Sequence, residues 1–396
     1  MLIQSNNKVD FIYNNNKIDL NYFFSKLSND SVPTISVFSK NKYSLLVKLY
    51  DIAFEYKIRY IKEPNKNIYI KCNKNIRDEL SLINNCMNAI DLDIKPSNIA
   101  TPKMLSLFIK NLFRNVKGVN VKILSAVEIK KKKLNLLYSL GNGTYNKPYF
   151  VIIERIIPNK PNNCIVGKGI TFDAGGTNIK THNSVYDMKY DKTGAVYTLY
   201  AIKNIIETTS NISIIGLLPF SENIITKKSL KPGDIIKSYS GKTVEIVNTD
   251  AEGRLILADA LAYSKNYNPS LLIDIATLTG SAGTINCYHS AYFYTKSRML
   301  RDFIEKISYK LDERMLGMPS WIKKGMLKST VADVKNYSVR CHDSYSATMF
   351  LHEFVPKTVK NWVHIDLAHE IYKKGELSIP KGKGILTLIE LIKKMN

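Results

Sequence analysis

Residues 162–172 read NNCIVGKGITF, residues 195–207 read AVYTLYAIKNIIE, and residues 212–220 read ISIIGLLPF. The first and third runs are short and apolar, as in buried β-strands, whereas the middle run has apolar residues at helical spacing. The same kinds of segment return at 254–280, where RLILADALAYSKNY precedes SLLIDIATLTG. This alternation predicts an α/β fold with a central, largely parallel sheet flanked by helices.

The pattern changes near residue 82, and this change divides the chain. Residues 1–82 mix short β-rich runs with polar, Asn-rich stretches and carry no cluster of catalytic residue types. We therefore expect a small, shortened N-terminal α/β domain over 1–82 and a larger catalytic α/β domain over 83–396. A chain of 396 residues with 45% hydrophobic residues is long enough for two cores.

The composition limits the possible binding partners and cellular location of the protein. The formal charge of +23 could serve nucleic acid, an anionic membrane or acidic substrates. Lysine is spread along the whole chain instead of gathering in one segment, so a nucleic-acid partner is not favoured. The five cysteines show no paired spacing, and no apolar run is long enough to cross a bilayer. These features predict a cytoplasmic protein with no membrane partner.

Four acidic residues stand at the ends or edges of core-like runs, where an unpaired charge would be costly. Asp173 follows the strand-like GKGITF, Asp191 comes just after SVYDMK, and Asp250 and Glu252 lie two residues apart. On an extended segment, residues at this spacing project to the same side, so the last pair could grip one cation or two. Alone, each acid is more often a helix cap or half of an ion pair, but a metal cluster would neutralise all four.

The heptapeptide NTDAEGR at 248–254 gives these acids a context. It resembles the signature of the leucine aminopeptidase (cytosol aminopeptidase) family, and further matches follow in order along the chain. They are VGKGITFDAGG at 166–176 with Lys180, MKYD at 188–191, DIATLTG at 274–280, ADVKN at 332–336, and FLHEFV and WVHIDLA near the end. The resemblance covers residues 85–396.

The resemblance implies two divalent metal ions per subunit and indicates their ligands. By position these ligands are Lys168, Asp173, Asp191, Asp250 and Glu252, with Asp173 and Glu252 bridging the two ions. Zinc is the expected metal, and one site is open to manganese or magnesium. Lys168 would bind as a neutral amine, because adjacent dications depress its pKa.

Two further positions match the catalytic residues of the family. A protonated Lys180 would stabilise the oxyanion that develops at the scissile carbonyl. Arg254 would hold a bicarbonate, which could carry a proton from water to the leaving amine. The implied reaction removes the N-terminal residue from peptides with a free N-terminus, because the metals would bind the unblocked amine. A homohexamer is also implied by the resemblance.

The substrate pocket of the family maps onto Met188, Thr277 and Gly280. Near these positions the sequence departs from the family pattern. Lys192 and Thr193 follow Asp191 where less bulky, uncharged residues are usual, and residues 342–351 (HDSYSATMFL) lack the usual glycines. A preference for leucine is therefore not implied.

Two other functions stay open at this point. One is a nucleic-acid-binding protein on the same fold, which a clustered basic stripe would favour. The other is a hexameric scaffold that has lost activity through its altered pocket loops. Retention of Lys180 and Arg254 counts against the scaffold, because a purely structural role needs neither.

Overall fold

The computed structural model describes residues 2–5, 8–13, 34–37, 42–59, 69–72, 76–284, 289–321, 325–338, 343–367, 371–374 and 377–396. The chain divides into two compact units, Met1–Asn88 with Lys310–Asp312 and Ala89–Tyr309 with Glu313–Asn396. The boundary expected between residues 82 and 83 falls within helix α3 (Arg77–Asp93) and stays a prediction.

The first unit contains a small sheet and a helix with one buried face. The strands β1 (Leu2–Ser5), β2 (Lys8–Tyr13), β3 (Thr34–Val37) and β4 (Tyr69–Cys72) lie side by side in that order. β1 and β2 are antiparallel, and the later pairs are parallel. Helix α2 (Lys42–Arg59) buries Leu45, Leu46, Leu49 and Ile52, which share one face of a helix.

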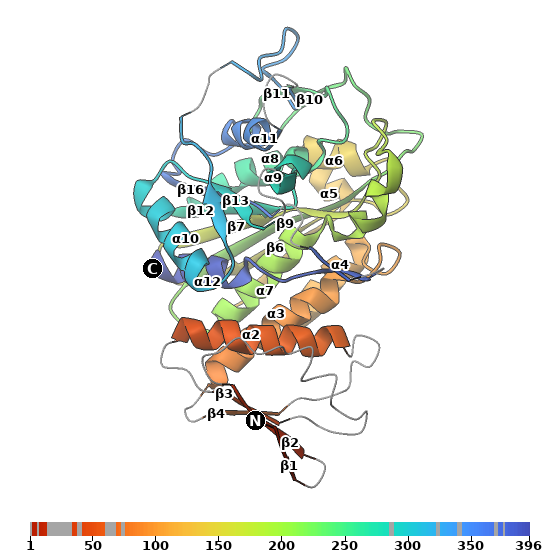
Figure 1. Cartoon of the computed structure of the whole chain (residues 1–396). Coiled ribbons are helices and arrows are strands. Elements are labelled where there is room, and N and C mark those ends of the chain that lie inside the picture. Colours follow the sequence, from red (N-terminus) through yellow and green to blue (C-terminus); the bar gives the residue numbers. More distant parts are fainter. Residues whose placement is uncertain are drawn as a thin grey trace. The chain divides into compact units, whose positions relative to one another are not determined.

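The second unit is built on a sheet with nine described strands (Figure 1). They are β5 (Asn120–Leu124), β6 (Tyr149–Arg155), β7 (Asn162–Gly167), β8 (Gly169–Asp173), β9 (Ser213–Asn223), β12 (Leu271–Ala276), β13 (Ala291–Tyr294), β14 (Met315–Gly317) and β16 (Asn361–Asp366). The order across the sheet is β14, β13, β16, β12, β7, β9, β6, β5, and β8 also pairs with β9. The central strands β16, β12, β7 and β9 are parallel, whereas the β13–β16, β6–β9 and β5–β6 pairs are antiparallel.

Helices cover both faces of this sheet. The main ones are α4 (Pro102–Leu112), α5 (Ala126–Lys131), α6 (Asn135–Gly141), α7 (Thr193–Thr208), α8 (Gly253–Tyr263), α9 (Gly280–Thr284), α10 (Arg298–Lys310), α11 (Asp343–His352) and α12 (Ile385–Lys394). Figure 1 shows α7 and α12 on one face, and α6, α8 and α11 on the other. The predicted fold class is therefore confirmed.

Short elements complete the second unit. Strands β10 (Ile235–Lys237), β11 (Thr243–Glu245) and β15 (Val334–Lys335) form one small sheet, and β17 (Ile371–Lys374) pairs with β18 (Leu377–Pro380). Two 3-10 helices, η1 (His182–Tyr190) and η2 (Ser264–Tyr267), precede α7 and follow α8. Among the described residues, no helix has the length and apolar character that a membrane span requires.

The burial of the central elements explains why their sequences look so apolar. Every residue of β9, β12 and α8 is buried. Parallel strands covered on both faces need apolar side chains at successive positions, which erases the alternation typical of a half-exposed strand. The apolar runs from which the sheet was predicted are therefore the strands of its centre.

The parallel centre also determines where the functional groups gather. β7 leads into Lys168, β8 ends at Asp173, β12 leads into Thr277, and β16 ends at Asp366. Since the carboxyl ends of parallel strands meet at one edge of a sheet, these residues lie at the same edge. Ligands of open α/β sheets bind at this edge.

One buried acid, Asp259 of α8, fastens neighbouring segments to this helix. Its Oδ2 accepts hydrogen bonds from the backbone N–H groups of Leu136 (2.8 Å) and Leu137 (3.2 Å), in the first turn of α6. Its Oδ1 accepts one from the N–H of Tyr239 (2.8 Å). Burial raises the pKa of Asp259 to about 7, although these three hydrogen bonds oppose the change.

This raised pKa predicts a pH dependence of stability. A native carboxyl with a raised pKa holds its proton more tightly than in the unfolded chain, so its contribution is largest below pH 4 and is lost as the pH rises to 7. A tenfold difference in proton affinity between the folded and unfolded chain corresponds to about 1.4 kcal/mol. We expect Asp259→Asn to flatten the fall in unfolding free energy between these pH values, measured by denaturant titration of the metal-free protein. An unchanged slope in the variant would contradict this assignment.

Candidate metal centre

The five predicted metal ligands come from four separate segments of the second unit. Lys168 follows β7, Asp173 ends β8, Asp191 lies between η1 and α7, and Asp250 and Glu252 directly precede α8. The structure brings all five together in contact, although they span 85 positions of the sequence, from 168 to 252.

Within this group, each lysine contacts two acidic side chains. Lys168 Nζ lies 2.7 Å from Asp191 Oδ1 and 3.1 Å from Glu252 Oε1. It also donates a hydrogen bond to the backbone oxygen of Thr277, at 2.7 Å. The predicted catalytic Lys180 joins the group, because its Nζ lies 2.9 Å from Asp173 Oδ2 and 2.5 Å from Asp250 Oδ1. Four carboxyl groups thus surround two ammonium groups, so acidic side chains outnumber basic ones in this cluster.

The acids are arranged as a cation site requires. Oxygen atoms of Asp173, Asp250 and Glu252 lie within 4.8 Å of one another. Lys168, Asp173 and Glu252 are each only 2% exposed. Asp191 Oδ2 is buried and has no hydrogen-bond partner among the described residues. An unpartnered buried carboxylate oxygen is costly, and a divalent cation with oxygen ligands would satisfy it.

The pKa values reflect this crowding. Burial, and then the charges of Glu252 and Asp191, raise the pKa of Asp173 well above its ordinary value. Burial raises the pKa of Asp191 to about 7, even though Lys168 lowers it. Burial lowers the pKa of Lys168, but the carboxylates of Asp191 and Glu252 outweigh burial, so the net change in its pKa is upward. In the metal-free chain Lys168 is therefore a stable ammonium that supplies part of the positive charge the acids require.

A glycine explains part of the local sequence. Gly253 opens α8 directly after Glu252, and a Cβ at this position would lie 2.6 Å from Lys168 Nζ. Real Cβ atoms do not approach other atoms this closely, so a side chain would displace Lys168. The glycine of NTDAEGR therefore leaves room for the lysine to reach the acids.

Further polar residues orient these groups and were missed in the sequence. Asn223, the last residue of β9, donates a hydrogen bond from Nδ2 to Asp173 Oδ1 at 2.7 Å. Asp366, the last residue of β16, accepts hydrogen bonds at Oδ1 from the N–H of Leu278 (3.0 Å) and at Oδ2 from Thr279 Oγ1 (2.7 Å). Each is a polar residue at the carboxyl end of an apolar run, and this signal could have indicated them.

A cavity of about 430 Å³ opens beside the charged cluster. The three predicted substrate-pocket residues, Met188, Thr277 and Gly280, all line this cavity. The five predicted metal ligands and Lys180 line it as well. Thr277 Oγ1 also donates to Asp191 Oδ1, at 2.9 Å. Apolar side chains of Ile179, Leu278 and Leu367 share the lining. The cavity therefore offers an apolar wall beside a charged end.

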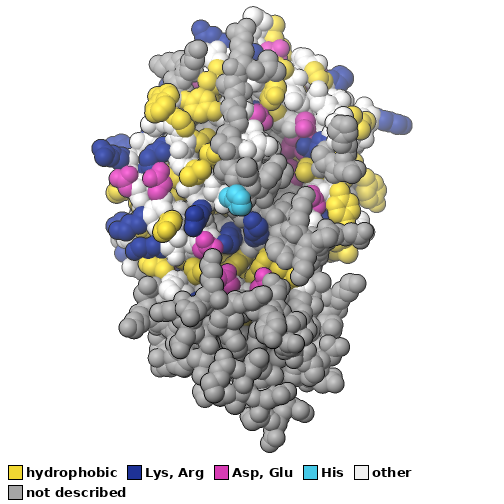
Figure 2. All heavy atoms as spheres, in the orientation of Figure 1, with side chains coloured by type: hydrophobic (Ala, Val, Ile, Leu, Met, Phe, Trp, Pro, Cys, Tyr) yellow, Lys and Arg dark blue, Asp and Glu magenta, His cyan; other side chains and the backbone are white. Residues whose placement is uncertain are grey.

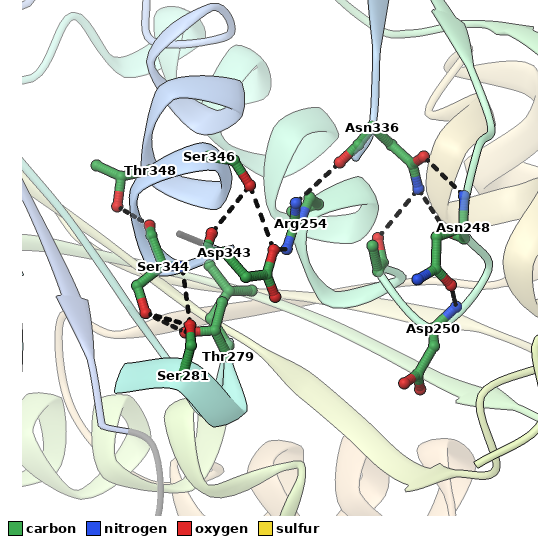
Figure 3. A network of polar contacts seen from close by, with 12 residues as sticks. Asn248, Asp250, Arg254, Thr279, Ser281, Asn336, Asp343, Ser344, Ser346 and Thr348 are labelled. Atoms are coloured by element: carbon green, nitrogen blue, oxygen red, sulfur yellow. Dashed lines mark hydrogen bonds and ion pairs between the residues drawn. The ribbon is translucent and has the colours of Figure 1, made fainter. Parts of the chain in front are cut away.

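Arg254 stands in the first turn of α8 and is buried, with 2% exposure. Its NH1 donates to the backbone oxygen of Asn336 at 2.9 Å. Its NH2 donates to Asp343 Oδ1 at 2.7 Å, and Figure 3 shows the guanidinium lying between these two partners. Asn336 in turn holds the NTDAEGR segment, because its Oδ1 accepts from the N–H of Val247 at 2.8 Å and its Nδ2 donates to the oxygen of Asn248 at 2.7 Å.

Comparison with known proteins places this chain in a family. The pattern described as the catalytic domain of the cytosol aminopeptidase family matches residues 88–389, about three quarters of the chain. The chain belongs to the cytosol aminopeptidase family. The predicted family is confirmed, and with it the enzyme class of its members, a metal-dependent aminopeptidase.

This chain covers a different share of each relative in the cytosol aminopeptidase family. It is 33% identical over 364 residues to a probable cytosol aminopeptidase of Wigglesworthia glossinidia brevipalpis, covering 90% of this chain and 72% of the relative. It is 38% identical over 283 residues to one of Chlorobium limicola, covering 70% of this chain and 56% of the relative.

Solved structures of similar proteins share the fold. The bottromycin maturation enzyme BotP in complex with Mn is 26% identical, with a TM-score of 0.82 over 91% of this chain and 83% of that chain. The leucine aminopeptidase of Caenorhabditis elegans is 25% identical, with a TM-score of 0.83 over 94% of this chain and 78% of that chain. A leucyl aminopeptidase of Trypanosoma brucei in complex with actinonin, at 22% identity and a TM-score of 0.86 over 95% of this chain and 76% of that chain, supports the fold alone.

Proposed function

We propose that this protein hydrolyses the N-terminal residue from peptides with a free N-terminus, using two divalent metal ions held at the candidate metal centre. The observation that carries the proposal is the buried cluster of four carboxylates and two lysines beside a cavity of about 430 Å³. Family membership supports the reaction type.

In this proposal Lys168, Asp173, Asp191, Asp250 and Glu252 would hold the metal ions. A pair of divalent ions supplies an activated water and polarises the scissile carbonyl. Lys168 must give up its proton to become a ligand, so loading the site releases a proton. Zinc is the proposed metal, with one site open to manganese or magnesium, and a manganese complex of the related enzyme BotP supports that option.

Lys180 is proposed to stabilise the oxyanion of the reaction. Burial lowers the pKa of Lys180, but the charges of Asp173, Glu252 and Asp250 raise it by a larger amount. The net change in its pKa is upward, so the side chain stays an ammonium. An ammonium already held in place by two carboxylates needs no reorganisation when charge develops on the substrate oxygen. Since Lys180 also lines the cavity, it can reach a bound substrate.

A homohexamer and a cytoplasmic location remain proposals that rest on the family alone. The nucleic-acid alternative gains no support from the charge distribution in Figure 2. On the face shown there, described Lys and Arg side chains lie in several separate places, with Asp and Glu between them, and form no continuous basic stripe.

Metal removal and substrate blocking test the proposed reaction together. We expect the protein loaded with zinc or manganese to release the N-terminal residue from unblocked peptides and not from their N-acetylated counterparts. Removing the metal with a chelator should abolish the activity, and adding metal back should restore it. No turnover of any unblocked peptide by the metal-loaded protein would overturn the proposal.

A further inference from the structure

The guanidinium of Arg254 already has an anionic partner from the chain itself. Its NH2 lies 2.7 Å from Asp343 Oδ1, and its NH1 donates to the oxygen of Asn336. Of the three guanidinium nitrogens of Arg254, only Nε has no hydrogen-bond partner among the described residues. A planar anion that pairs with one edge of a guanidinium needs two adjacent N–H groups. A bicarbonate at Nε and NH2 would therefore have to share NH2 with Asp343 or displace it.

The surroundings hold Asp343 firmly in this position. Asp343 is the first residue of α11, and its Oδ1 also accepts a hydrogen bond from Ser346 Oγ at 3.2 Å. The backbone N–H of the next residue, Ser344, donates to Ser281 Oγ at 3.0 Å, and the Ser344 hydroxyl lies 2.6 Å from Thr279 Oγ1. Figure 3 shows these hydroxyl groups joining the start of α11 to the segment after β12. The carboxylate is thus tied to a segment that lines the substrate cavity.

The charges of Arg254 and Asp343 also balance each other. Arg254 is buried with 2% exposure, and a buried guanidinium needs a compensating anion. Asp343 supplies one negative charge, the same as a bicarbonate. Its Oδ2 has no hydrogen bond with a described residue, and 31% of its side chain is exposed.

We propose that Asp343 takes the place at Arg254 that was expected for a bicarbonate, so that this enzyme carries its anion within its own chain. The inference rests on the proposed aminopeptidase function and concerns how the same site works. It makes Asp343 a positioning residue for Arg254 and predicts an activity that needs no added bicarbonate. The sequence already departs from the family here, because residues 342–351 lack the usual glycines.

Chemical rescue tests this inference. In carbonate-free buffer, the metal-loaded wild-type enzyme should be unaffected by added bicarbonate or formate. Asp343→Ala should lose on the order of 10²-fold in kcat, the range for a misplaced catalytic group, because Arg254 is left without its anion, and it should regain most of this loss with either anion. Asp343→Asn, which fills the same space without a charge, should be slow and should not be rescued. Glu353→Ala removes an exposed acid paired with Lys242 and should behave like the wild type.

A binding measurement separates this inference from the proposed function. Bicarbonate should raise the thermal unfolding midpoint of Asp343→Ala and leave that of the wild type unchanged, whether or not a peptide substrate is known. If wild-type activity depends on bicarbonate, or if Asp343→Ala neither slows nor responds to anions in rate and in midpoint, the inference is wrong. If instead no peptide is cleaved by the wild type, the proposed function fails, and the change in midpoint alone decides the place of Asp343.

Discussion

Replacement of Glu252 by glutamine should lower kcat by 10³-fold or more, on the order expected when a two-metal site is dismantled. Glu252 is 2% exposed and directly contacts Lys168, at 3.1 Å. Burial opposes its charge, but Lys168 and then Lys180 lower its pKa, so it is an anion in the folded protein. Glutamine keeps the shape but removes the charge that two cations would share.

Two measurements check this prediction. Peptide hydrolysis gives the loss of kcat, and metal analysis after dialysis should show fewer bound ions per chain than in the wild type. Glu245→Gln is the matched control, because this partly buried glutamate pairs with Ser329 in a small sheet outside the candidate metal centre. A Glu252→Gln enzyme with full metal content and undiminished kcat would refute the role of this residue.

Lys192→Met should lower the free energy of unfolding by about 3–5 kcal/mol, the usual cost of breaking a buried ion pair. Lys192 is fully buried, and its Nζ donates to the backbone oxygens of Asp93 and Lys189, both at 2.6 Å. It lies 3.7 Å from Asp93 Oδ1. Burial lowers the pKa of Lys192 and raises that of Asp93 to about 6, so each group depends on the other for its charge.

The double variant Asp93→Val with Lys192→Met should recover part of this loss, because no charge is then left unpaired. Thr193 Oγ1 lies within hydrogen-bond distance of both Asp93 Oδ2 and the backbone oxygen of Tyr190, so its single O–H can still donate to Tyr190 when Asp93 is replaced. Tryptophan fluorescence during denaturant unfolding reports on the second unit, which contains Asp93 and Lys192. Both tryptophans of the chain, Trp321 and Trp362, belong to that unit. A double variant less stable than Lys192→Met would contradict the pairing.

The sequence predicted the parallel centre of the sheet because strands covered on both faces leave a strong signal in the apolar runs. The family resemblance also assigned Lys168, Asp191 and Glu252 to one metal site, and the structure brings these three residues into contact. The pairings of Lys192 with Asp93 and of Arg254 with Asp343 could not be predicted in this way, because the partners lie 99 and 89 positions apart. A single acid next to a helix has no pattern that indicates its distant partner, which only tertiary packing supplies.

The predicted ligands of the candidate metal centre belong to segments that meet only when β7, β8 and the starts of α7 and α8 are in place. Ions bound there would hold the folded chain and have little affinity for the unfolded one, so they would shift the folding equilibrium by mass action. Metal supply would then govern the lifetime of this enzyme as well as its rate. A chain deprived of metal would open more often and be degraded sooner, which would clear inactive copies from the cell.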